Sequence, residues 1–283
     1  MHALRPVPRR TFLKLTAAAG AAALVAPRLL ASRVSAAVGI SALDPMTQPR
    51  FVNPLPNPLD PSFIFQPTVP DGDHYEIGVH EFEQALGLVD PASGAPLITR
   101  VWGYGTATQP ATYPGRTLMA RRDQPLSVRW TNDLVSAAGS RLSHLLPIDA
   151  TLHWALMDAD TPYPQSGVPI VTHLHGGHNR SASDGLPDAW FTPGYDQTGR
   201  LFNEVYTYVN DQEAATLWYH DHALGITRLN VYAGLAGFYI LRDANEDALV
   251  ADHQLPTGPY EIPLVIQDRM FDEFGQLLYP FER

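Results

Sequence analysis

Seven short segments with the length and composition of β-strands, separated by turn residues, constrain the fold of this chain more than any other feature. Residues 124–130 alternate polar and apolar side chains, which places Leu126, Val128 and Trp130 on one face of a strand. The 283 residues include 26 prolines and 21 glycines and show no long helical period. The pattern predicts an all-β fold, a Greek-key sandwich or barrel. The seven segments are residues 75–82, 97–104, 126–131, 168–175, 204–210, 215–220 and 234–241.

The first 36 residues have the features of an export signal. An Arg-Arg pair is followed by Phe-Leu-Lys at residues 12–14, by an apolar run over residues 15–26 and by small residues at 34–36. The run is too short to cross a bilayer, for which a helix needs about 20 residues. This order predicts a twin-arginine signal peptide over residues 1–36 and a periplasmic or extracellular protein without stable membrane insertion. An ordinary secretory signal and an uncleaved anchor are the alternatives.

Charge and cysteine content exclude several function classes. The net charge is -10, but the first 36 residues hold six basic and no acidic residues, so the remainder has a net charge of -16. Such an acidic body repels nucleic acid, and we therefore expect no nucleic-acid partner. The chain has no cysteine, which excludes disulfides, cysteine zinc sites and thiol catalysis.

Proline content divides the chain that follows the signal. Residues 37–72 contain eight prolines, which cannot donate in a β-ladder, and these residues are predicted to form an extended arm. Apolar side chains at Phe51 and at residues 63–65 favour an arm that packs on the domain over a disordered linker. The strand pattern occupies residues 73–245, which we expect to form one β domain.

The last part of the chain, residues 246–283, is predicted to hold a linker and the start of a second domain. Residues 243–258 are polar with Pro and Gly and indicate a linker, and residues 262–266 have the apolar composition of a new strand. The sequence ends at Arg283, too soon for that strand to build a core of its own. We therefore expect the second domain to be truncated.

Two His-x-His pairs, His173/His175 and His220/His222, are the strongest chemical signal. On a strand, residues i and i+2 project from one face about 6.5–7 Å apart, so both imidazoles of a pair can reach metal ions at about 2.0–2.1 Å. Two adjacent strands of this kind bring four imidazoles together. Imidazole suits copper, zinc, iron and nickel, so the pairs alone leave the metal open, and structural hydrogen-bonded histidines are the alternative. Asp221 points to the opposite face, and we expect it behind the ligands or on the surface.

The sequence around both pairs resembles the first two copper motifs of the multicopper oxidases. His-Leu-His-Gly-Gly at 173–177 and Trp-Tyr-His-Asp-His at 218–222 carry the likeness, which is closest over residues 170–242 to the branch of spore-coat laccase, bilirubin oxidase and phenoxazinone synthase. The resemblance implies a cupredoxin-like Greek-key barrel or sandwich over residues 73–245 and the start of a second cupredoxin domain within 246–283. It also implies an oxidoreductase that takes electrons from small phenolic or other aromatic substrates, or from metal ions, and reduces dioxygen to water.

The resemblance assigns a role to each histidine of the two pairs. His173 corresponds to a ligand of the type 2 copper ion, and His175, His220 and His222 correspond to ligands of the type 3 pair in a trinuclear cluster. Asp184 matches an acidic residue that helps supply protons for oxygen reduction. The alternative for Asp184 is a simple Asp-Gly turn without a chemical role.

The absence of cysteine limits what this chain can do. The family's type 1 copper site needs a cysteine thiolate, and the chain holds only half of the ligands of the trinuclear cluster. We therefore expect a copper-binding N-terminal portion, inactive alone, whose C-terminal cupredoxin domain is missing from this chain or supplied by a partner chain. The alternatives are a copper-holding module without turnover and a copper-less structural scaffold, against which the four retained histidines argue.

Overall fold

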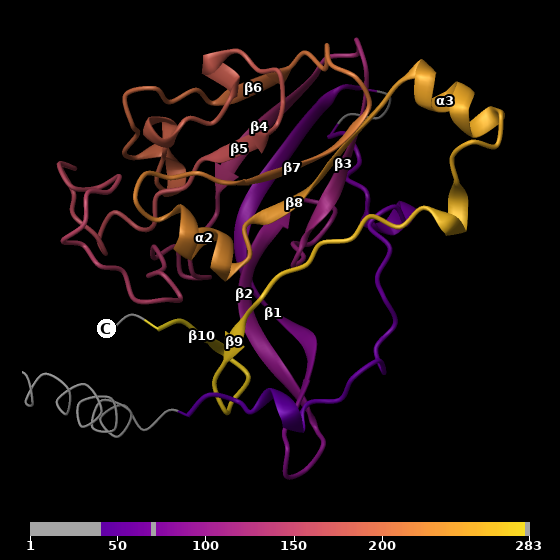
Figure 1. The fold of residues 1–283 in the computed structure, drawn as a ribbon. Coiled ribbons are helices and arrows are strands. Elements are labelled where there is room, and N and C mark those ends of the chain that lie inside the picture. Colours follow the sequence, from indigo (N-terminus) through magenta and orange to yellow (C-terminus); the bar gives the residue numbers. More distant parts are fainter. Residues whose placement is uncertain (1–40, 69–71, 281–283) are drawn as a thin grey trace, which may run out of the picture.

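Two four-stranded sheets form the body of the protein (Figure 1). The computed structural model describes residues 41–68 and 72–280, so the predicted signal peptide lies outside the described residues. The strand orders are β2-β1-β4-β6 and β3-β8-β7-β5, and each sheet contains one parallel pair, β1 with β4 and β3 with β8. Neighbouring strands that are distant in sequence are typical of the Greek-key arrangement, which the strand pattern predicts.

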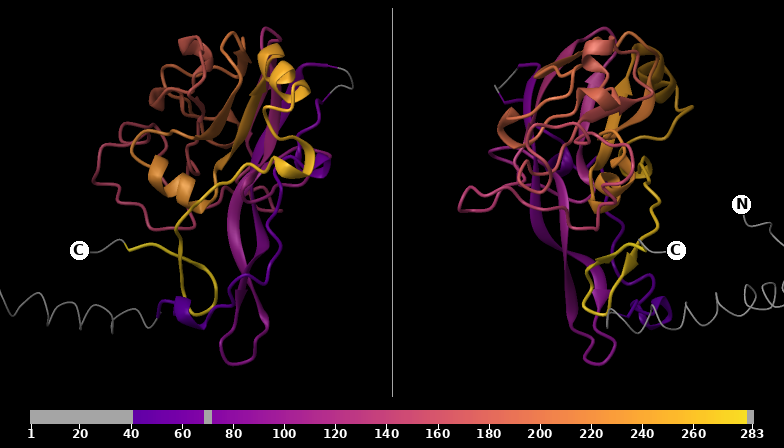
Figure 2. Two further views of the ribbon diagram at one scale, coloured as in Figure 1. Left: turned by 45° about the vertical axis from the view of Figure 1, so that its right-hand side comes forward. Right: turned by 90° about the vertical axis from the view of Figure 1, so that its left-hand side faces the viewer.

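The strands are short except for β1 and β2, which continue beyond the body as a long hairpin (Figure 2). The first sheet consists of β1 (His74–Val89), β2 (Pro96–Gly105), β4 (Leu126–Asn132) and β6 (Val205–Tyr208). The second consists of β3 (Gly115–Arg121), β5 (Thr172–His175), β7 (Ala215–Asp221) and β8 (Ala236–Arg242). A small hairpin pairs β9 (Met270–Phe271) with β10 (Leu277–Leu278).

In the described part of the chain, helices are few and short. The α-helices are α2 (Thr227–Ala233) and α3 (Ala244–Ala251), and the 3-10 turns are η1 (Pro45–Thr47), η2 (Pro61–Phe63), η3 (Ser181–Ser183), η4 (Pro187–Ala189), η5 (Pro193–Tyr195) and η6 (Gly258–Tyr260). Over residues 41–68 and 72–280, none of the helices has the length and apolar character needed to cross a membrane.

Inward-facing side chains of the two sheets share one core. In β4, the buried Leu126, Val128 and Trp130 alternate with half-buried neighbours, as the period-2 pattern predicts. Tyr104 of β2 and Tyr219 of β7 pack against Trp130, with ring centroids 5.5 and 5.6 Å from the indole. Burial of each large side chain contributes about 1.5–3 kcal/mol, so this aromatic cluster ties β7 firmly to the opposite sheet.

Two elements differ from the sequence prediction. The strand pattern does not predict β3, because few of its seven residues are apolar and only Leu118 and Ala120 are buried hydrophobics. The expected linker over residues 243–258 contains the short helix α3, which the sequence pattern does not predict. The Asp243 side chain caps the helix by accepting the Glu246 N–H at 2.8 Å. None of the residues of α3 is buried, which is why no apolar stripe indicated a helix.

The C-terminal segment also departs from its prediction. Residues 262–266 run as an extended chain but belong to no strand of the described structure, and Ile266 is almost fully exposed. The hairpin of β9 and β10 instead docks on β2, where the Thr99 hydroxyl donates to the Gly275 carbonyl at 2.7 Å. Ala42 forms a bridge with Asp272 beside this hairpin.

The proline-rich segment lies along the domain over its described residues. Gln48 exchanges two hydrogen bonds with the backbone of Val89 through its side-chain amide, and Phe65 is buried and donates its N–H to Thr117 at 2.9 Å. Phe51 is fully exposed, so it does not contribute to the packing that the sequence suggested for it. The packed-arm interpretation thus rests on Gln48 and Phe65.

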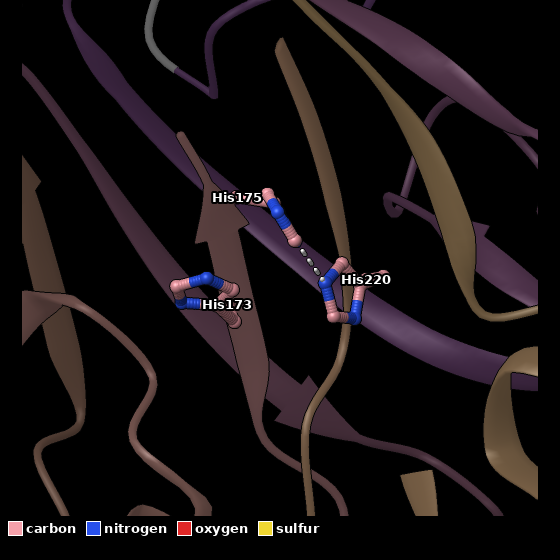
Figure 3. Close-up of side chains that lie close together, drawn as sticks. All are labelled: His173, His175 and His220. Carbon is pink, nitrogen blue, oxygen red and sulfur yellow. Dashed lines mark hydrogen bonds between the residues drawn. The ribbon is translucent and has the colours of Figure 1, made fainter. Parts of the chain in front are cut away.

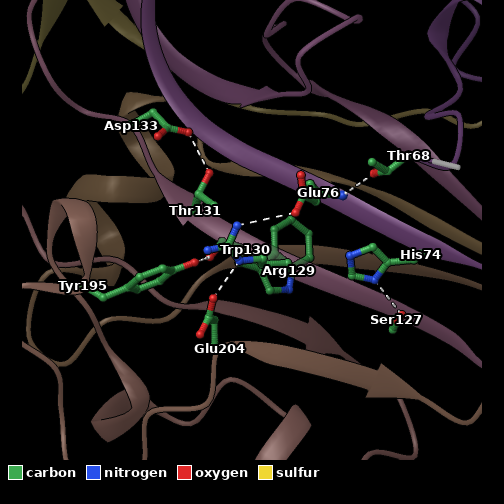
Figure 4. A network of polar contacts seen from close by, with 10 residues as sticks. All are labelled: Thr68, His74, Glu76, Ser127, Arg129, Trp130, Thr131, Asp133, Tyr195 and Glu204. Atoms are coloured by element: carbon green, nitrogen blue, oxygen red, sulfur yellow. Dashed lines mark hydrogen bonds and ion pairs between the residues drawn. The ribbon is translucent and has the colours of Figure 1, made fainter.

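A polar network on the first sheet joins β1, β4 and the segment that leads to β6 (Figure 4). Arg129 donates to Glu204 at 2.7 Å and to Glu76 at 3.4 Å, and its guanidinium lies 5.8 Å from the ring centroid of Tyr195. The Tyr195 hydroxyl donates to the Trp130 carbonyl at 2.7 Å. Because these charged groups are largely accessible to water, we expect each ion pair to contribute less than about 1 kcal/mol.

Candidate metal centre

His173 and His175 of β5 and His220 of β7 lie close together (Figure 3), and His222, which directly follows β7, lies beside His173 and His220. His173 stands directly opposite His220 in the ladder, and the period of two brings His175 and His222 to the same face. The ring centroid of His173 lies 4.7 Å from that of His222, 5.4 Å from that of His220 and 5.6 Å from that of His175. The sequence prediction that two strands bring four imidazoles together is therefore met by the geometry.

Backbone carbonyl groups fix three of the four rings through Nδ1. His173 donates to the Asp184 carbonyl at 2.5 Å, His222 to the Gly185 carbonyl at 3.0 Å and His220 to the Asp221 carbonyl at 2.7 Å. A carbonyl oxygen can only accept, so Nδ1 must carry the proton and the lone pair of each neutral ring lies at Nε2. The Nε2 atoms of these three rings are therefore the ones available to a metal ion.

His175 is oriented differently from the other three. Its Nδ1 lies 3.2 Å from Nε2 of His220 (Figure 3), and one nitrogen atom each from His173, His175 and His220 lie within 4.8 Å of one another. Trp218 stacks on both rings of this contact, with its centroid 4.1 Å from that of His220 and 5.2 Å from that of His175. Nδ1 is thus the His175 atom that faces Nε2 of His220.

Gly185 holds its carbonyl group at the cluster because it has no side chain. Its φ is +74°, and a Cβ atom at this position would lie 2.1 Å from the carbonyl oxygen of Thr172 and 2.7 Å from the Cα atom of His173. Only glycine allows the loop after η3 to approach β5 this closely. The Asp184-Gly185 turn therefore holds His173 and His222, one from each pair, a role that the sequence motif does not reveal.

Burial keeps the central imidazoles neutral. It lowers the pKa of His220 to about 4, and it also lowers the pKa of His173. Neutral imidazoles with fixed Nδ1–H groups fit a metal ion that binds imidazole, such as copper or zinc. His175 is exposed, so the cluster is open on one side.

Two acidic residues lie at different sides of the cluster. The carboxylate of Asp184 approaches His173, with Oδ2 at 3.5 Å from Nδ1, and its side chain is partly exposed. Asp221 is fully buried, so the possibility that it is a surface carboxylate is wrong. Burial raises the pKa of Asp221 to about 7.

Comparison with known proteins identifies the family. Residues 165–246, which contain all four histidines, match the family model for multicopper oxidases. A laccase of Bacillus subtilis is 40% identical over 236 residues, which cover 83% of this chain and 41% of the relative. A laccase of Haloferax volcanii is 37% identical over 281 residues, which cover 97% of this chain and 42% of the relative. The chain belongs to the multicopper oxidase family.

Family membership implies copper as the cofactor. A solved laccase structure from Pediococcus acidilactici matches with a TM-score of 0.55 and 23% identity, over 82% of this chain and 38% of that chain. This likeness confirms the cupredoxin-like fold. The chain spans about 41% of the length of the curated laccases it matches, so the activity of a whole multicopper oxidase is not established for it.

The export signal is also confirmed by comparison. Residues 6–26 match the model of the twin-arginine translocation signal sequence. This multicopper oxidase chain is therefore exported by the twin-arginine route and is periplasmic or extracellular.

Proposed function

We propose that His173, His175, His220 and His222 supply half of the ligands of a trinuclear copper cluster that reduces dioxygen to water. By position in the family motifs, His173 binds the type 2 ion and the other three bind the type 3 pair. The observation that carries this proposal is the common face of the four rings, three of which are fixed through Nδ1 so that the lone pair of each lies at Nε2. Bound copper supplies the one-electron redox chemistry, with electrons from phenolic or other aromatic reductants or from metal ions.

The protein's own contribution is to hold the imidazoles neutral and in place before the metal binds. The carbonyl groups of residues 184, 185 and 221 restrain three rings, and Trp218 covers His220. Restraint of this kind reduces the conformational entropy lost when a ligand binds. His175, the most exposed of the four histidines, faces the side from which the remaining ligands approach.

Asp184 is the proposed source of protons for oxygen reduction. Its partly exposed carboxylate is placed between solvent and the Nδ1 side of His173, at 3.5 Å. The variant Asp184→Asn keeps the backbone carbonyl that holds His173. We expect it to bind copper as tightly as the wild type and to slow turnover once the cluster is complete. Weaker copper binding in this variant would show that the carboxylate acts on the ligands instead of on the proton supply.

The remaining parts of the active site are proposed to come from outside this chain. A type 1 copper site requires a thiolate, and the 283 residues contain no cysteine. We propose that a C-terminal cupredoxin domain supplies that site and the other cluster ligands. We propose that the chain has four parts. They are the signal at 1–36, the arm at 37–72, the N-terminal cupredoxin domain at 73–245 and the linker and start of a second cupredoxin domain at 246–283.

Copper titration tests the ligand assignment. The double variant His173→Ala, His220→Ala removes two facing imidazoles, and we expect it to lose high-affinity copper binding. The control is His178→Ala, because the His178 side chain is 69% exposed and contacts Asp211 at 3.4 Å. Unchanged copper binding in the double variant would contradict the assignment.

A second candidate function is copper holding without turnover. The absence of cysteine favours it for the chain taken alone, because the electron-accepting type 1 site cannot form. An oxidase assay with a phenolic substrate distinguishes the two. Turnover is expected only after addition of a C-terminal cupredoxin domain, and turnover by the chain alone would overturn our assignment of the missing site.

A further inference from the structure

A buried carboxylate connects the two histidine strands from behind. Asp221 lies between His220 and His222 in sequence, but its side chain points to the opposite face and is fully buried. Its Oδ2 accepts the Val171 N–H at 3.0 Å and its Oδ1 accepts the Ala223 N–H at 3.0 Å. One side chain thus bonds to the segment that enters β5 and to the turn that leaves β7.

Both of these backbone groups are close in sequence to the proposed ligands. Val171 precedes His173 by two residues, and its carbonyl accepts the His222 N–H at 2.8 Å. Ala223 directly follows His222. The Asp221 carboxylate therefore sets how His222 lies relative to His173, whose rings stack with centroids 4.7 Å apart.

Two further buried side chains extend this network. The amide of Asn230, which is fully buried in α2, donates to the Pro169 carbonyl at 3.1 Å, and Asn230 also interacts with Asp221, which opposes the rise in the pKa of that carboxyl that burial causes. Its Oδ1 lies 3.0 Å from Nε2 of His144. Because Nδ1 of His144 accepts the Leu146 N–H at 2.8 Å, Nε2 must carry the proton and donate to Asn230. This bond also fixes which way the Asn230 amide points.

We infer that Asp221 is a positioning residue for the histidine cluster, held by Asn230 and His144, and that it fixes the relative placement of the two His-x-His pairs. The inference rests on the proposed function for its link to copper. Outer groups that hold metal ligands in place alter metal affinity by about 10- to 100-fold when they are replaced. Asn230 and His144 are separated from Asp221 by 9 and 77 residues, so only the fold brings the three together.

The carboxylate cannot be replaced by an amide without loss. Both oxygens of Asp221 accept backbone N–H groups. In Asp221→Asn, one end of the side chain becomes an NH₂ group that must face a donor, either Val171 or Ala223. A buried N–H without an acceptor is strongly disfavoured, so either the segment that enters β5 or the turn after β7 must shift in this variant.

The experiment compares three variants of the full chain: Asp221→Asn, Asn230→Leu and the control Tyr239→Phe. The control removes a buried hydrogen bond of 2.6 Å, from the Tyr239 hydroxyl to Asn210, and so measures the effect of lost stability alone. Thermal unfolding is followed by circular dichroism, and a temperature is chosen at which every variant tested is folded. Affinity for Cu(II) is measured by competition with a chelator, and the exchange of the Nδ1–H protons of His220 and His222 is measured by NMR without metal.

We expect Asp221→Asn to bind Cu(II) at least about tenfold more weakly than the wild type and to exchange both imidazole protons faster. Asn230→Leu keeps both backbone bonds to the carboxylate, so it should show the same changes to a smaller extent. It also decides the matter if Asp221→Asn does not fold. The control should match the wild type in both measurements.

Wild-type affinity and wild-type proton exchange in a folded Asp221 or Asn230 variant would overturn the inference. The proposed function fails in a different way, namely if the wild-type chain itself does not bind Cu(II) through the four histidines. In that case the proton-exchange measurement without metal still decides whether Asp221 positions the rings.

Discussion

His144 should lower the stability of this protein as the pH falls. One substitution at this position should be less stable than the wild type near neutral pH and more stable than it at low pH. Its side chain is buried, its ring packs edge-on against Trp102 at 4.5 Å, and burial lowers its pKa from 6.5 to about 4. Between these values the unfolded chain binds a proton that the folded protein does not. The free energy of unfolding contributed by this group is therefore complete above about pH 6.5 and falls as the pH decreases towards 4. The total loss corresponds to about 3 kcal/mol, and most of it is reached by pH 4.5.

The perturbation is His144→Gln. Glutamine carries no proton in this range and still offers an amide donor to Asn230, but it loses the aromatic contact with Trp102 and weakens the bond from the Leu146 N–H. We expect the variant to be less stable than the wild type by about 1–2 kcal/mol near pH 7.5. Near pH 4.5 the order should reverse, with the variant more stable by roughly 1 kcal/mol, because only the wild type must keep a buried histidine unprotonated. The two stability curves should cross between about pH 5 and 6.

Urea denaturation followed by circular dichroism at several pH values measures the difference. The buried Asp221 titrates in the same range with the opposite sign, because its raised pKa lowers stability as the pH rises from 3.8 towards 7. Both proteins share that contribution, so only the difference between their curves reports on His144. Parallel curves that keep the wild type more stable at every pH would refute the reasoning, since they would mean that His144 has the same pKa in the folded and unfolded states.

Three further outcomes follow from the structure. Gly185→Ala would place a Cβ atom 2.1 Å from the Thr172 carbonyl oxygen. We expect this variant to lower the free energy of unfolding by more than about 2 kcal/mol and to weaken copper binding. Calorimetry can measure the binding, and wild-type copper affinity would contradict the role of this loop. Tyr219→Phe removes a hydroxyl that donates to a backbone carbonyl at 2.6 Å, which should lower stability by about 1–3 kcal/mol and leave copper stoichiometry unchanged. Glu204→Ala breaks the 2.7 Å contact with Arg129 (Figure 4) and should cost less than about 1 kcal/mol, with a smaller effect at high salt; a larger, salt-independent loss would show that the pair is effectively buried.

The parts of the fold that the sequence predicts are those that depend on local periodicity. The alternation in residues 126–131 is set by burial on one face, and β4 lies there as expected. The pattern does not reveal β3, because that strand is recognisable only once β8 supplies its hydrogen bonds and the core covers Leu118. It misses α3 because this helix buries nothing, although Asp243 and Glu246 stand at the cap and third positions of an N-terminus.

In the candidate site, too, features set by neighbouring residues could be predicted from the sequence, whereas contacts between distant residues could not. Two residues at i and i+2 on a strand must share a face, so each histidine pair could be predicted by itself. The groups that hold the rings lie elsewhere in the chain: His173 depends on a carbonyl 11 residues away and His222 on one 37 residues away. His144 acts on Asn230 across 86 residues. Contacts of this range have no spacing rule, so the sequence offers only the Asp-Gly pair at 184–185 as a sign of a special turn.

The contacts that hold each histidine ring in this chain indicate which rings are in place before further ligands are added and which ring must turn. Each ring that is fixed through Nδ1 is held by backbone of this chain, so these contacts exist before any second domain contributes ligands. His175 lacks such a carbonyl contact among the described interactions and is also the exposed ring. Its contact is with Nε2 of His220, itself a proposed ligand atom, so the His175 ring must turn when a metal ion binds there, whereas the other three rings keep their carbonyl bonds. Replacement of His175 should therefore impair completion of the cluster more than the first binding of copper by this chain, and replacement of the buried His220 should impair both.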